Sequence, residues 1–366
     1  MRKSLLAVAV LGAFAGTAMA ADVTLYGVVD TGLMYTHTKT KYADGSSVKT
    51  NTFEMMSGKQ AGSRWGLKGT EDLGNGYSVG FILESGFDSD TGKGKSQLFN
   101  RQSTLSISGP FGTVLAGRMG SVNQGTSSTG KIGMLSAFGT SYSDYSANAV
   151  GVFAAGKILP NMLTYQSPKF AGVQLHAQYA MSDDAGDGAS ENKARKTNRY
   201  AALAATYNAG ALNLYGAVDA TDYKHIKDAK NHTATTYTFG GNYDFGVLKL
   251  FGGVQYFDKV ANDVFKGTKI FSGKFKGWGA QVSASMPVAG GTLLAGVGYM
   301  DGKKAKGQEI DKNDINRIRA TVGYSYPLSK RTNVYAAAGF GRDEQKDTEK
   351  TKYDYATAFF GLRHNF

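Results

Sequence analysis

Apolar and polar residues alternate with a period of two along most of the chain beyond residue 20. This period predicts β-strands that have one apolar and one polar face. Beyond residue 20 no apolar run approaches the roughly 20 residues that a membrane-spanning helix needs. Clear examples of the alternation lie in the stretches 77–84, 173–182, 248–256 and 317–325.

The connections between the predicted strands fall into two classes that alternate strictly along the chain. Very short turns are predicted at 73–76, 109–112, 167–172, 208–210, 244–246, 287–291 and 327–331. Longer charged or Gly-rich stretches lie at about 36–62, 88–96, 119–160, 183–197, 223–232, 259–275, 303–313 and 343–352. Seven turns and eight long connections join sixteen strands, with both ends of the chain on the side of the short turns.

This sorting favours a transmembrane β-barrel over a soluble sandwich, because single-chain outer-membrane barrels have short turns on one side and long loops on the other. Lipid offers no hydrogen-bond partner, so the strands must close into a ring without edges. A barrel of 16 to 18 strands is too wide for side chains to fill. The prediction is therefore a 16-stranded antiparallel transmembrane β-barrel that encloses water.

The first twenty residues have the features of a secretory signal peptide. Arg2 and Lys3 precede an uncharged apolar stretch, and Ala18 to Ala20 offer the small residues of a cleavage site. Residues 21–366 are then expected to form the barrel in a Gram-negative outer membrane, after export through the periplasm. The chain has no cysteine, which excludes disulfide staples and thiolate metal sites.

Nothing in the sequence predicts catalysis or a cofactor. The five histidines are scattered, and no nucleophile motif such as GxSxG occurs, so we expect no catalytic, cofactor-binding or metal-binding residues. Gly74-Asn75-Gly76 links two predicted strands and opens no helix, so it is a hairpin turn rather than a phosphate loop. Nucleic acid is not an expected partner in this compartment.

Several stretches spread over the whole chain resemble the trimeric general porins of Gram-negative bacteria, most closely those of the beta-proteobacteria. The stretches are DVTLYGVVDTGL (22–33), SRWGLKGTEDLGNG (63–76), FNRQ (99–102), GPFGTVLAGR (109–118), LTYQSP (163–168), LKLFGGVQYF (248–257), LSKRTNVYAAAGF (328–340) and GLRHNF (361–366). The resemblance implies a diffusion channel for ions and small hydrophilic solutes, built as a homotrimer. It also implies that the third extracellular loop, residues 119–160, folds inward and narrows the pore.

The resemblance also implies basic residues on the pore wall opposite this loop, at Arg64 and Arg101. Arg64 and Lys68 have the opposite parity to Trp65, so they face the lumen if Trp65 faces lipid. The parity of Arg101 is ambiguous, but a charge on the lipid face would cost about 2–4 kcal/mol, which favours the lumen. A third basic position of the family corresponds to Gln166 here, so the basic row is weaker.

The expected constriction has few acids. Glu84, on the inner face of its strand, is expected to pair with the arginines. Arg118 is a further residue that we expect on the pore wall. On the loop side only Asp144 is acidic, against Lys131 and Lys157. A narrow section with net positive charge enriches anions, since its width is below the Debye length of about 8–10 Å. The sequence therefore predicts mild anion preference.

The apolar alternation continues to Phe366, which resembles the C-terminal signal that such barrels present to the barrel-assembly machinery. Outer-membrane lipids and lipopolysaccharide are the other expected partners. Two alternatives remain open, namely a substrate-specific outer-membrane channel and a surface adhesin whose function lies in its loops. A ligand-gated transporter would need a plug domain before the barrel, and the first strand follows the signal directly.

Overall fold

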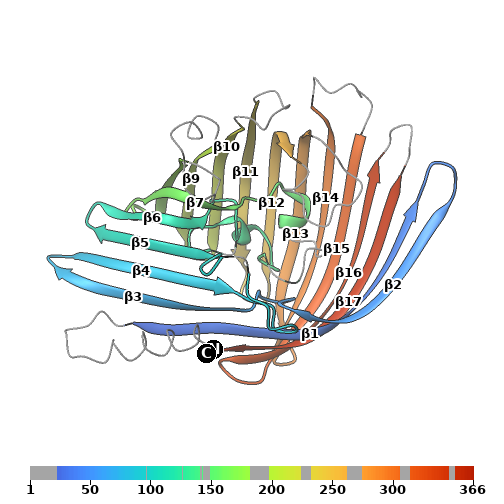
Figure 1. The fold of residues 1–366 in the computed structure, drawn as a ribbon, viewed down its shortest axis with the longest axis horizontal. Coiled ribbons are helices and arrows are strands. Elements are labelled where there is room, and N and C mark those ends of the chain that lie inside the picture. The colour runs from blue at the N-terminus through green and yellow to red at the C-terminus, as the bar shows by residue number, and fades with distance from the viewer. Residues whose placement is uncertain are drawn as a thin grey trace, which may run out of the picture.

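The computed structural model describes residues 23–95, 97–125, 127–140, 142, 149–181, 198–223, 232–261, 274–305, 314–345 and 351–366. Most of these residues belong to one antiparallel sheet of seventeen strand segments (Figure 1). The segments are β1 (Thr24–Lys41), β2 (Ser47–Ser57), β3 (Arg64–Gly74), β4 (Tyr77–Gly86), β5 (Gln102–Gly109), β6 (Gly112–Gly120), β7 (Ile158–Gln166), β8 (Val173–Ala180), β9 (Arg199–Ala209), β10 (Leu212–Tyr223), β11 (His232–Asp244), β12 (Lys249–Ala261), β13 (Lys274–Val288), β14 (Gly291–Lys304), β15 (Asp314–Pro327), β16 (Thr332–Gln345) and β17 (Lys352–Asn365).

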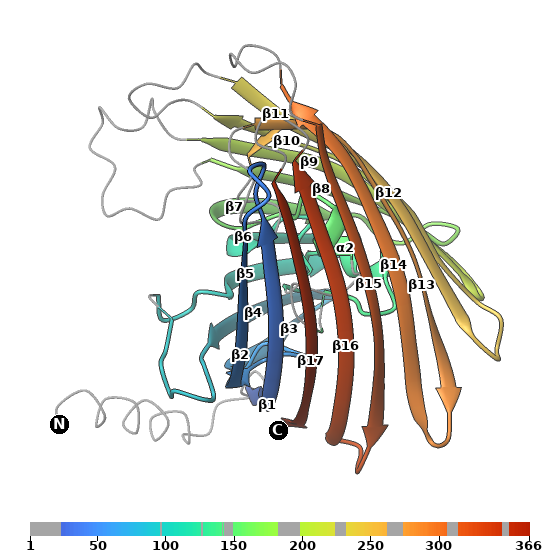
Figure 2. The same ribbon diagram turned by 90° about the vertical axis from the view of Figure 1, so that its right-hand side faces the viewer.

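The sheet closes on itself, because β1 pairs with β17 from Val28↔Asn365 to Lys41↔Lys352. The segments β2 and β3 both pair with β1, so they are two parts of one barrel strand that is interrupted at residues 58–63. The predicted 16-stranded antiparallel barrel is therefore confirmed. Figure 2 shows the start of β1 beside the end of β17.

The two classes of connection also alternate as predicted. Seven connections have two to six residues, at 75–76, 110–111, 167–172, 210–211, 245–248, 289–290 and 328–331. The other eight leave the opposite ends of the strands, at 42–46, 87–101, 121–157, 181–198, 224–231, 262–273, 305–313 and 346–351.

One predicted long connection is mostly wrong. Residues 36–62 were expected to form a loop, but β1 continues to Lys41 and β2 begins at Ser47, so only residues 42–46 connect the strands. The register runs on from Thr36↔Thr52 to Lys41↔Ser47. The extension is rich in Thr and Lys on both faces, so it lacks the apolar row from which a strand is recognised.

The distribution of side chains is the reverse of that in a soluble protein. Large apolar residues of the strands are exposed, as in Leu175 (56%), Leu203 (64%) and Phe239 (59%). Polar residues of the alternate rows are buried, such as His176 at 2% and Thr238 at 3%. Exposure of these large apolar side chains to water would be unfavourable, whereas lipid around the wall stabilises the arrangement.

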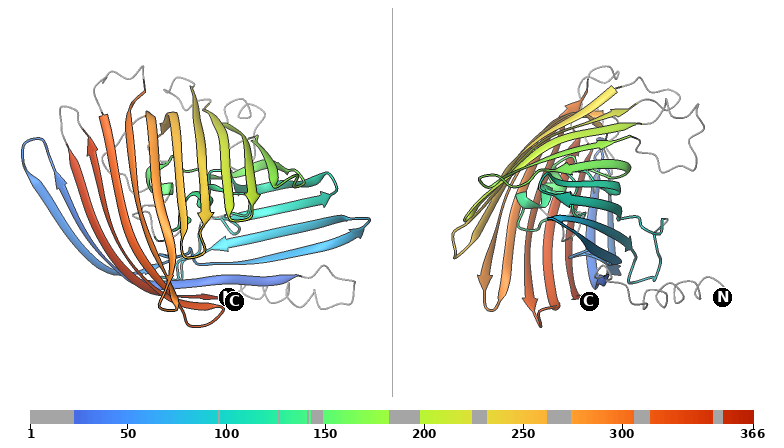
Figure 3. Two further views of the ribbon diagram at one scale, coloured as in Figure 1. Left: turned by 180° about the vertical axis from the view of Figure 1, so that it is seen from behind. Right: turned by 90° about the vertical axis from the view of Figure 1, so that its left-hand side faces the viewer.

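The third long connection joins β6 to β7 and contains two short helical turns, η1 (Ile132–Leu135) and α2 (Ala149–Val152). The turn η1 contacts β10, β11 and β12, and α2 contacts β13, β14 and β15. Figure 3 shows this green segment beside the strands of the curved wall in two views. Within the described residues, no helix is long and apolar enough to cross a membrane.

Candidate functional site

The first part of the site is a charged cluster on β3, β4 and the connection that precedes β5. Glu84 accepts a hydrogen bond from the Nε of Arg101 at 2.6 Å, and the Nε of Arg64 lies 3.4 Å from its other carboxylate oxygen. The hydroxyl of Tyr26 also donates to Glu84 at 3.1 Å. The predicted pairing of Glu84 with both arginines is thus present.

Strand register places this cluster on the inner row of the wall. Arg64 lies across from Val28, which is 4% exposed, whereas Leu67 lies across from the exposed Leu25. Lys68 shares the inner row, and its ammonium lies 5.4 Å from the centre of the Tyr26 ring.

The structure explains why the strand alternation leaves the orientation of Arg101 ambiguous. The strand β5 begins one residue later, at Gln102, so strand alternation does not extend to Arg101. Its guanidinium lies over glycines on both sides, since a Cβ at Gly86 would be 3.2 Å from Arg101 Cδ and one at Gly62 3.3 Å from its Nη1. Side chains at these two glycines would crowd the arginine.

Three other predicted site residues lie away from Glu84. Arg118 has the strand parity of Val114 and Ala116, the outward row, and its Nε donates to the carbonyl of Asn100 at 3.0 Å. Gln166 ends β7 and lies across from His176, near the short-turn end. Lys131 precedes η1, and its ammonium lies 3.5 Å from the Ser128 carbonyl.

Burial, together with the nearby Lys169, lowers the pKa of Lys131 below its usual value of 10.5. Asp144, the predicted acid of the third connection, lies outside the described residues. The predicted signal peptide, residues 1–20, also lies outside them.

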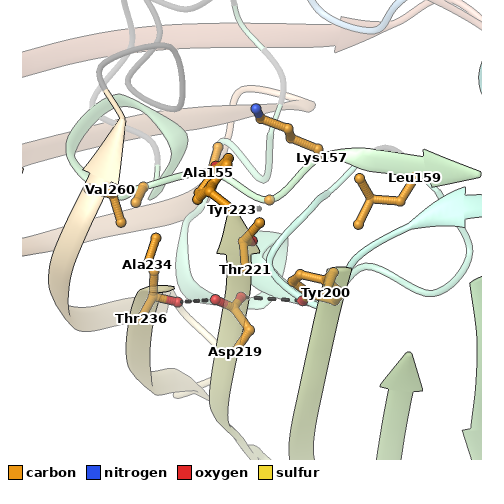
Figure 4. A pocket seen from close by; sticks show the side chains of 12 residues that line it. Ala155, Lys157, Leu159, Tyr200, Asp219, Thr221, Tyr223, Ala234, Thr236 and Val260 are labelled. Atoms are coloured by element: carbon orange, nitrogen blue, oxygen red, sulfur yellow. Dashed lines mark hydrogen bonds between the residues drawn. The ribbon is translucent and has the colours of Figure 1, made fainter. Parts of the chain in front are cut away.

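The second part of the site is the third connection, whose start is fixed to the wall by a buried polar network. Asn123 donates to Asp219 at 2.6 Å and to Thr236 at 3.1 Å, and it accepts from the Tyr215 hydroxyl at 2.8 Å. Asp219 also accepts from Thr236 at 2.7 Å and from Tyr200 at 3.3 Å (Figure 4). Asp219, Thr236 and Tyr200 line a cavity of about 50 Å³, together with Lys157.

Further along, the connection exchanges hydrogen bonds with polar residues of the inner row. Gln255 accepts from the Ala154 amide at 2.6 Å and donates to its carbonyl at 3.3 Å. Asn242 donates to the Met134 carbonyl at 2.9 Å, and Ser283 accepts from the Ala137 amide at 2.9 Å. Inward polar residues therefore satisfy backbone groups of a connection that has little regular structure of its own.

Glycines in the same wall give the connection room to pack closely. A Cβ at Gly279 would lie 2.1 Å from the Val152 carbonyl oxygen. At Gly296 it would lie 3.2 Å from the ring of Phe138, which is 2% exposed. The abundance of glycine in these strands thus has a local cause, since larger residues would push the connection away from the wall.

A fully buried ion cluster supports the far part of the connection. Arg317 forms a bidentate pair with Asp343 at 3.0 and 3.1 Å, and Arg319 lies 2.8 Å from the same carboxylate. Arg317 also donates to the Gly151 carbonyl in α2 at 2.8 Å. The side chains of all three residues are 0% exposed. The cluster thereby ties α2 to β15 and β16.

The interruption of the second barrel strand meets the same connection. Asp30 of β1 accepts from the amides of Gln60 at 2.9 Å and Ala61 at 2.6 Å, and from the Tyr335 hydroxyl at 2.5 Å. The Gln60 amide group donates to the Tyr142 hydroxyl at 2.9 Å. Residues 58–63 and the third connection therefore support one another.

Sequence reasoning missed most of these supporting residues. Asn123, Asp219 and the Arg317–Arg319–Asp343 cluster have no motif, and their partners come from other strands. The one available signal was the alternation of apolar and polar residues, which places Arg317 and Arg319 on the inward face of their strand. Among the described residues, no group of three His, Asp or Glu side chains could hold a metal ion.

The two parts of the site face each other across the ring. In the closed order of sixteen strands, the strand that contains β3 lies eight positions from β11, and η1 packs on β10 to β12. The charged cluster therefore lies on the wall opposite the segment around η1. Both consist of side chains on the inner rows, next to the enclosed space.

Comparisons with known proteins agree with this architecture. A family model described as "Gram-negative porin" matches residues 7–348. An outer membrane porin of Bordetella pertussis is 33% identical over the full length of both chains. A solved anion-selective porin from Comamonas acidovorans is 27% identical with a TM-score of 0.68, covering 95% of this chain and 100% of its own.

A Vibrio cholerae outer membrane protein solved in its trimer form has the same fold, with a TM-score of 0.57 at 16% identity. It covers 95% of this chain and 100% of its own. The family match extends over most of the sequence, and the closed barrel has the architecture of the solved relatives. The chain therefore belongs to the Gram-negative porin family and is a channel of the outer membrane rather than an enzyme.

Proposed function

We propose that this general porin prefers anions mildly, because its narrowest section lies between the Glu84 cluster and the third connection. The observation that carries the proposal is the charge balance of the cluster, in which Arg64, Lys68 and Arg101 surround the single acid Glu84. In the third connection Lys131 adds positive charge, and Asp343 of β16 is neutralised by its two arginines.

The physical basis is an incompletely screened field. Salt screens charges over about 8–10 Å, so across a constriction no wider than this it screens fixed charges only in part. Fixed positive charge there raises the local concentration of anions and lowers that of cations. The relative from Comamonas acidovorans is named an anion-selective porin, which supports the same preference here.

The test is the reversal potential of purified protein in a planar bilayer under a KCl gradient. We expect a sign that reports chloride preference, and we expect R64Q/R101Q to shift the potential toward cation preference. K330Q/R331Q is the matched control, because it removes two positive charges from the short turn 328–331. A cation-selective wild type would overturn the charge assignment.

The assembly and surroundings of the barrel complete the proposal. The protein forms a homotrimer, with its long connections facing the cell exterior and its short turns in the periplasm. Recognition by the assembly machinery uses the last strand together with Phe366, which follows it. The Phe366 amide donates to the Gly27 carbonyl at 3.1 Å, and the residue is 43% exposed. Conductance steps that occur in threes would support three pores per assembly, and single independent steps would contradict it.

A further inference from the structure

Arg363, close to the end of β17, belongs to the inner face of the wall. Its neighbour Leu362 is 49% exposed on the lipid side, so strand alternation turns Arg363 inward. In the sheet Arg363 lies directly across from Asp30 of β1 and from Asn333 of β16. Asp30 is 0% exposed, whereas Arg363 is only half-buried. A solute in the enclosed space therefore meets the guanidinium of Arg363 and not the carboxylate of Asp30.

The N–H groups of Arg363 are mostly left for a ligand. Among the residues that the structure describes, its Nη2 donates to the side-chain oxygen of Asn365 at 3.1 Å, and its Nε is buried without a hydrogen-bond partner. A guanidinium has five N–H groups. Asp30 accepts its own hydrogen bonds from two backbone amides and from the Tyr335 hydroxyl. It therefore offsets part of the charge of Arg363 from a distance, without binding its N–H groups.

Arg363 also lies beside the Glu84 cluster. Arg64 is directly across from Val28 of β1, and Val28 is directly across from Asn365 of β17. Two strand spacings of about 4.8 Å and two residues of about 3.4 Å place the backbones of Arg64 and Arg363 roughly 12 Å apart. The charges of the two guanidinium groups act on each other across this distance. Arg363 thus adds a fourth basic side chain to the three that surround Glu84.

The third connection reaches the same place. The ring of Tyr142 packs against that of Tyr335 in β16, with the centroids 6.0 Å apart. Its hydroxyl accepts from Gln60 at 2.9 Å, and the charge of Arg363 acts on this hydroxyl. Arg363 therefore lies where the wall, residues 58–63 and the third connection meet.

We propose that Arg363 is a further selectivity-determining residue of the pore, which binds small anions transiently as they pass Arg64. An anion that leaves Arg64 reaches a second guanidinium over a distance close to the Debye length of about 8–10 Å, so the two positive fields overlap. Cations meet the same charge as a barrier, and the buried Asp30 cannot contact them. The inference rests on the proposed anion preference and names a residue that contributes to it.

The chain contains no cysteine, so a single introduced thiol permits a test on the folded channel. Full-length R363C is placed in a planar bilayer, and its reversal potential in a KCl gradient is measured before and after a thiosulfonate reagent attaches an ethylammonium or an ethylsulfonate group. We expect the chloride-to-potassium permeability ratio of R363C to be about twofold below that of wild type. Ethylammonium should restore the ratio, and ethylsulfonate should lower it about twofold further. Because the reagents act after folding, a lower folding efficiency of the variant cannot produce these shifts.

H364C is the matched control, because His364 is the next residue of β17 and lies exposed on the outer face. Neither reagent should change its permeability ratio. Equal ratios for R363C and wild type, the same response of R363C to both reagents, or an equal response of H364C would overturn the inference. If wild type prefers cations but R363C responds as expected, the proposed anion preference fails and the role of Arg363 stands. A wild type that prefers chloride together with an unresponsive R363C is the opposite result, in which only the role of Arg363 fails.

Discussion

The buried cluster of Arg317, Arg319 and Asp343 gives a quantitative test of how the third connection is supported. The substitution D343N removes the carboxylate that both guanidinium groups share. The side chains of all three residues are 0% exposed. Removing one partner of a buried ion pair costs about 3–5 kcal/mol, because it leaves an uncompensated charge. That corresponds to a roughly 150- to 5,000-fold change in the unfolding equilibrium constant.

The assay is guanidinium unfolding of the folded barrel in detergent micelles, followed by tryptophan fluorescence. D258N is the matched control, because Asp258 lies 3.9 Å from Lys259 in a partly exposed pair that contributes at most about 1 kcal/mol. Stability of D343N within about 1 kcal/mol of wild type would refute the reasoning.

A charge-free version of the cluster separates stability from anchoring. R317M/R319M/D343L replaces the ions by apolar side chains, and such replacements are often neutral or stabilising. We expect this variant to regain most of the stability that D343N loses. It also lacks the hydrogen bond from Arg317 to the Gly151 carbonyl. Its channels should therefore be noisier than those of wild type even though the barrel is stable.

Three further predictions concern the channel itself. E84Q removes the only acid of the Arg64–Arg101 cluster, so we expect the chloride-to-potassium permeability ratio from reversal potentials to rise about two- to threefold at 0.1 M salt, and an unchanged ratio would contradict the charge assignment. N123A removes three buried hydrogen bonds and leaves the Tyr215 hydroxyl without its acceptor, at a cost of about 1–3 kcal/mol, while Asp219 and Thr236 stay bonded to each other, so thermal stability should fall and current noise should rise, unlike in the exposed control N208A. Because burial lowers the pKa of Lys131, this lysine loses its charge at a lower pH than an exposed lysine; anion preference should fall as pH rises toward 10.5, and K131Q should lack this early part of the fall.

The membrane-spanning part of the fold could be predicted from the sequence because lipid imposes a strict pattern. In stretches such as 173–180 every second residue must be apolar, so strands, turns and inward parity are all visible. The same parity places Arg64 and Glu84 on one face, where the structure pairs them. Near the membrane, local sequence therefore carries most of the information.

Beyond the membrane this pattern is lost, since both faces of a strand are in water. For that reason the sequence predicts a loop at residues 36–62 and places Asp343 in a connection, although β16 continues to Gln345. The ion cluster of Asp343 was missed as a consequence. Arg118 differs in the opposite sense. The sequence analysis places it on the pore wall, but the regular strand alternation places it on the outer face. Contacts between the third connection and distant strands depend on closure of the whole barrel, which no local pattern encodes.

The seam between β1 and β17 has a consequence for how the protein reaches its folded state. Its paired residues, such as Val28 and Asn365, are more than 300 positions apart, so this ladder forms only when nearly the whole chain is available. Until then both terminal strands expose unpaired backbone groups, which invite pairing with other chains. Cells that make this protein must therefore keep the unfinished polypeptide apart from its neighbours until the ring is sealed.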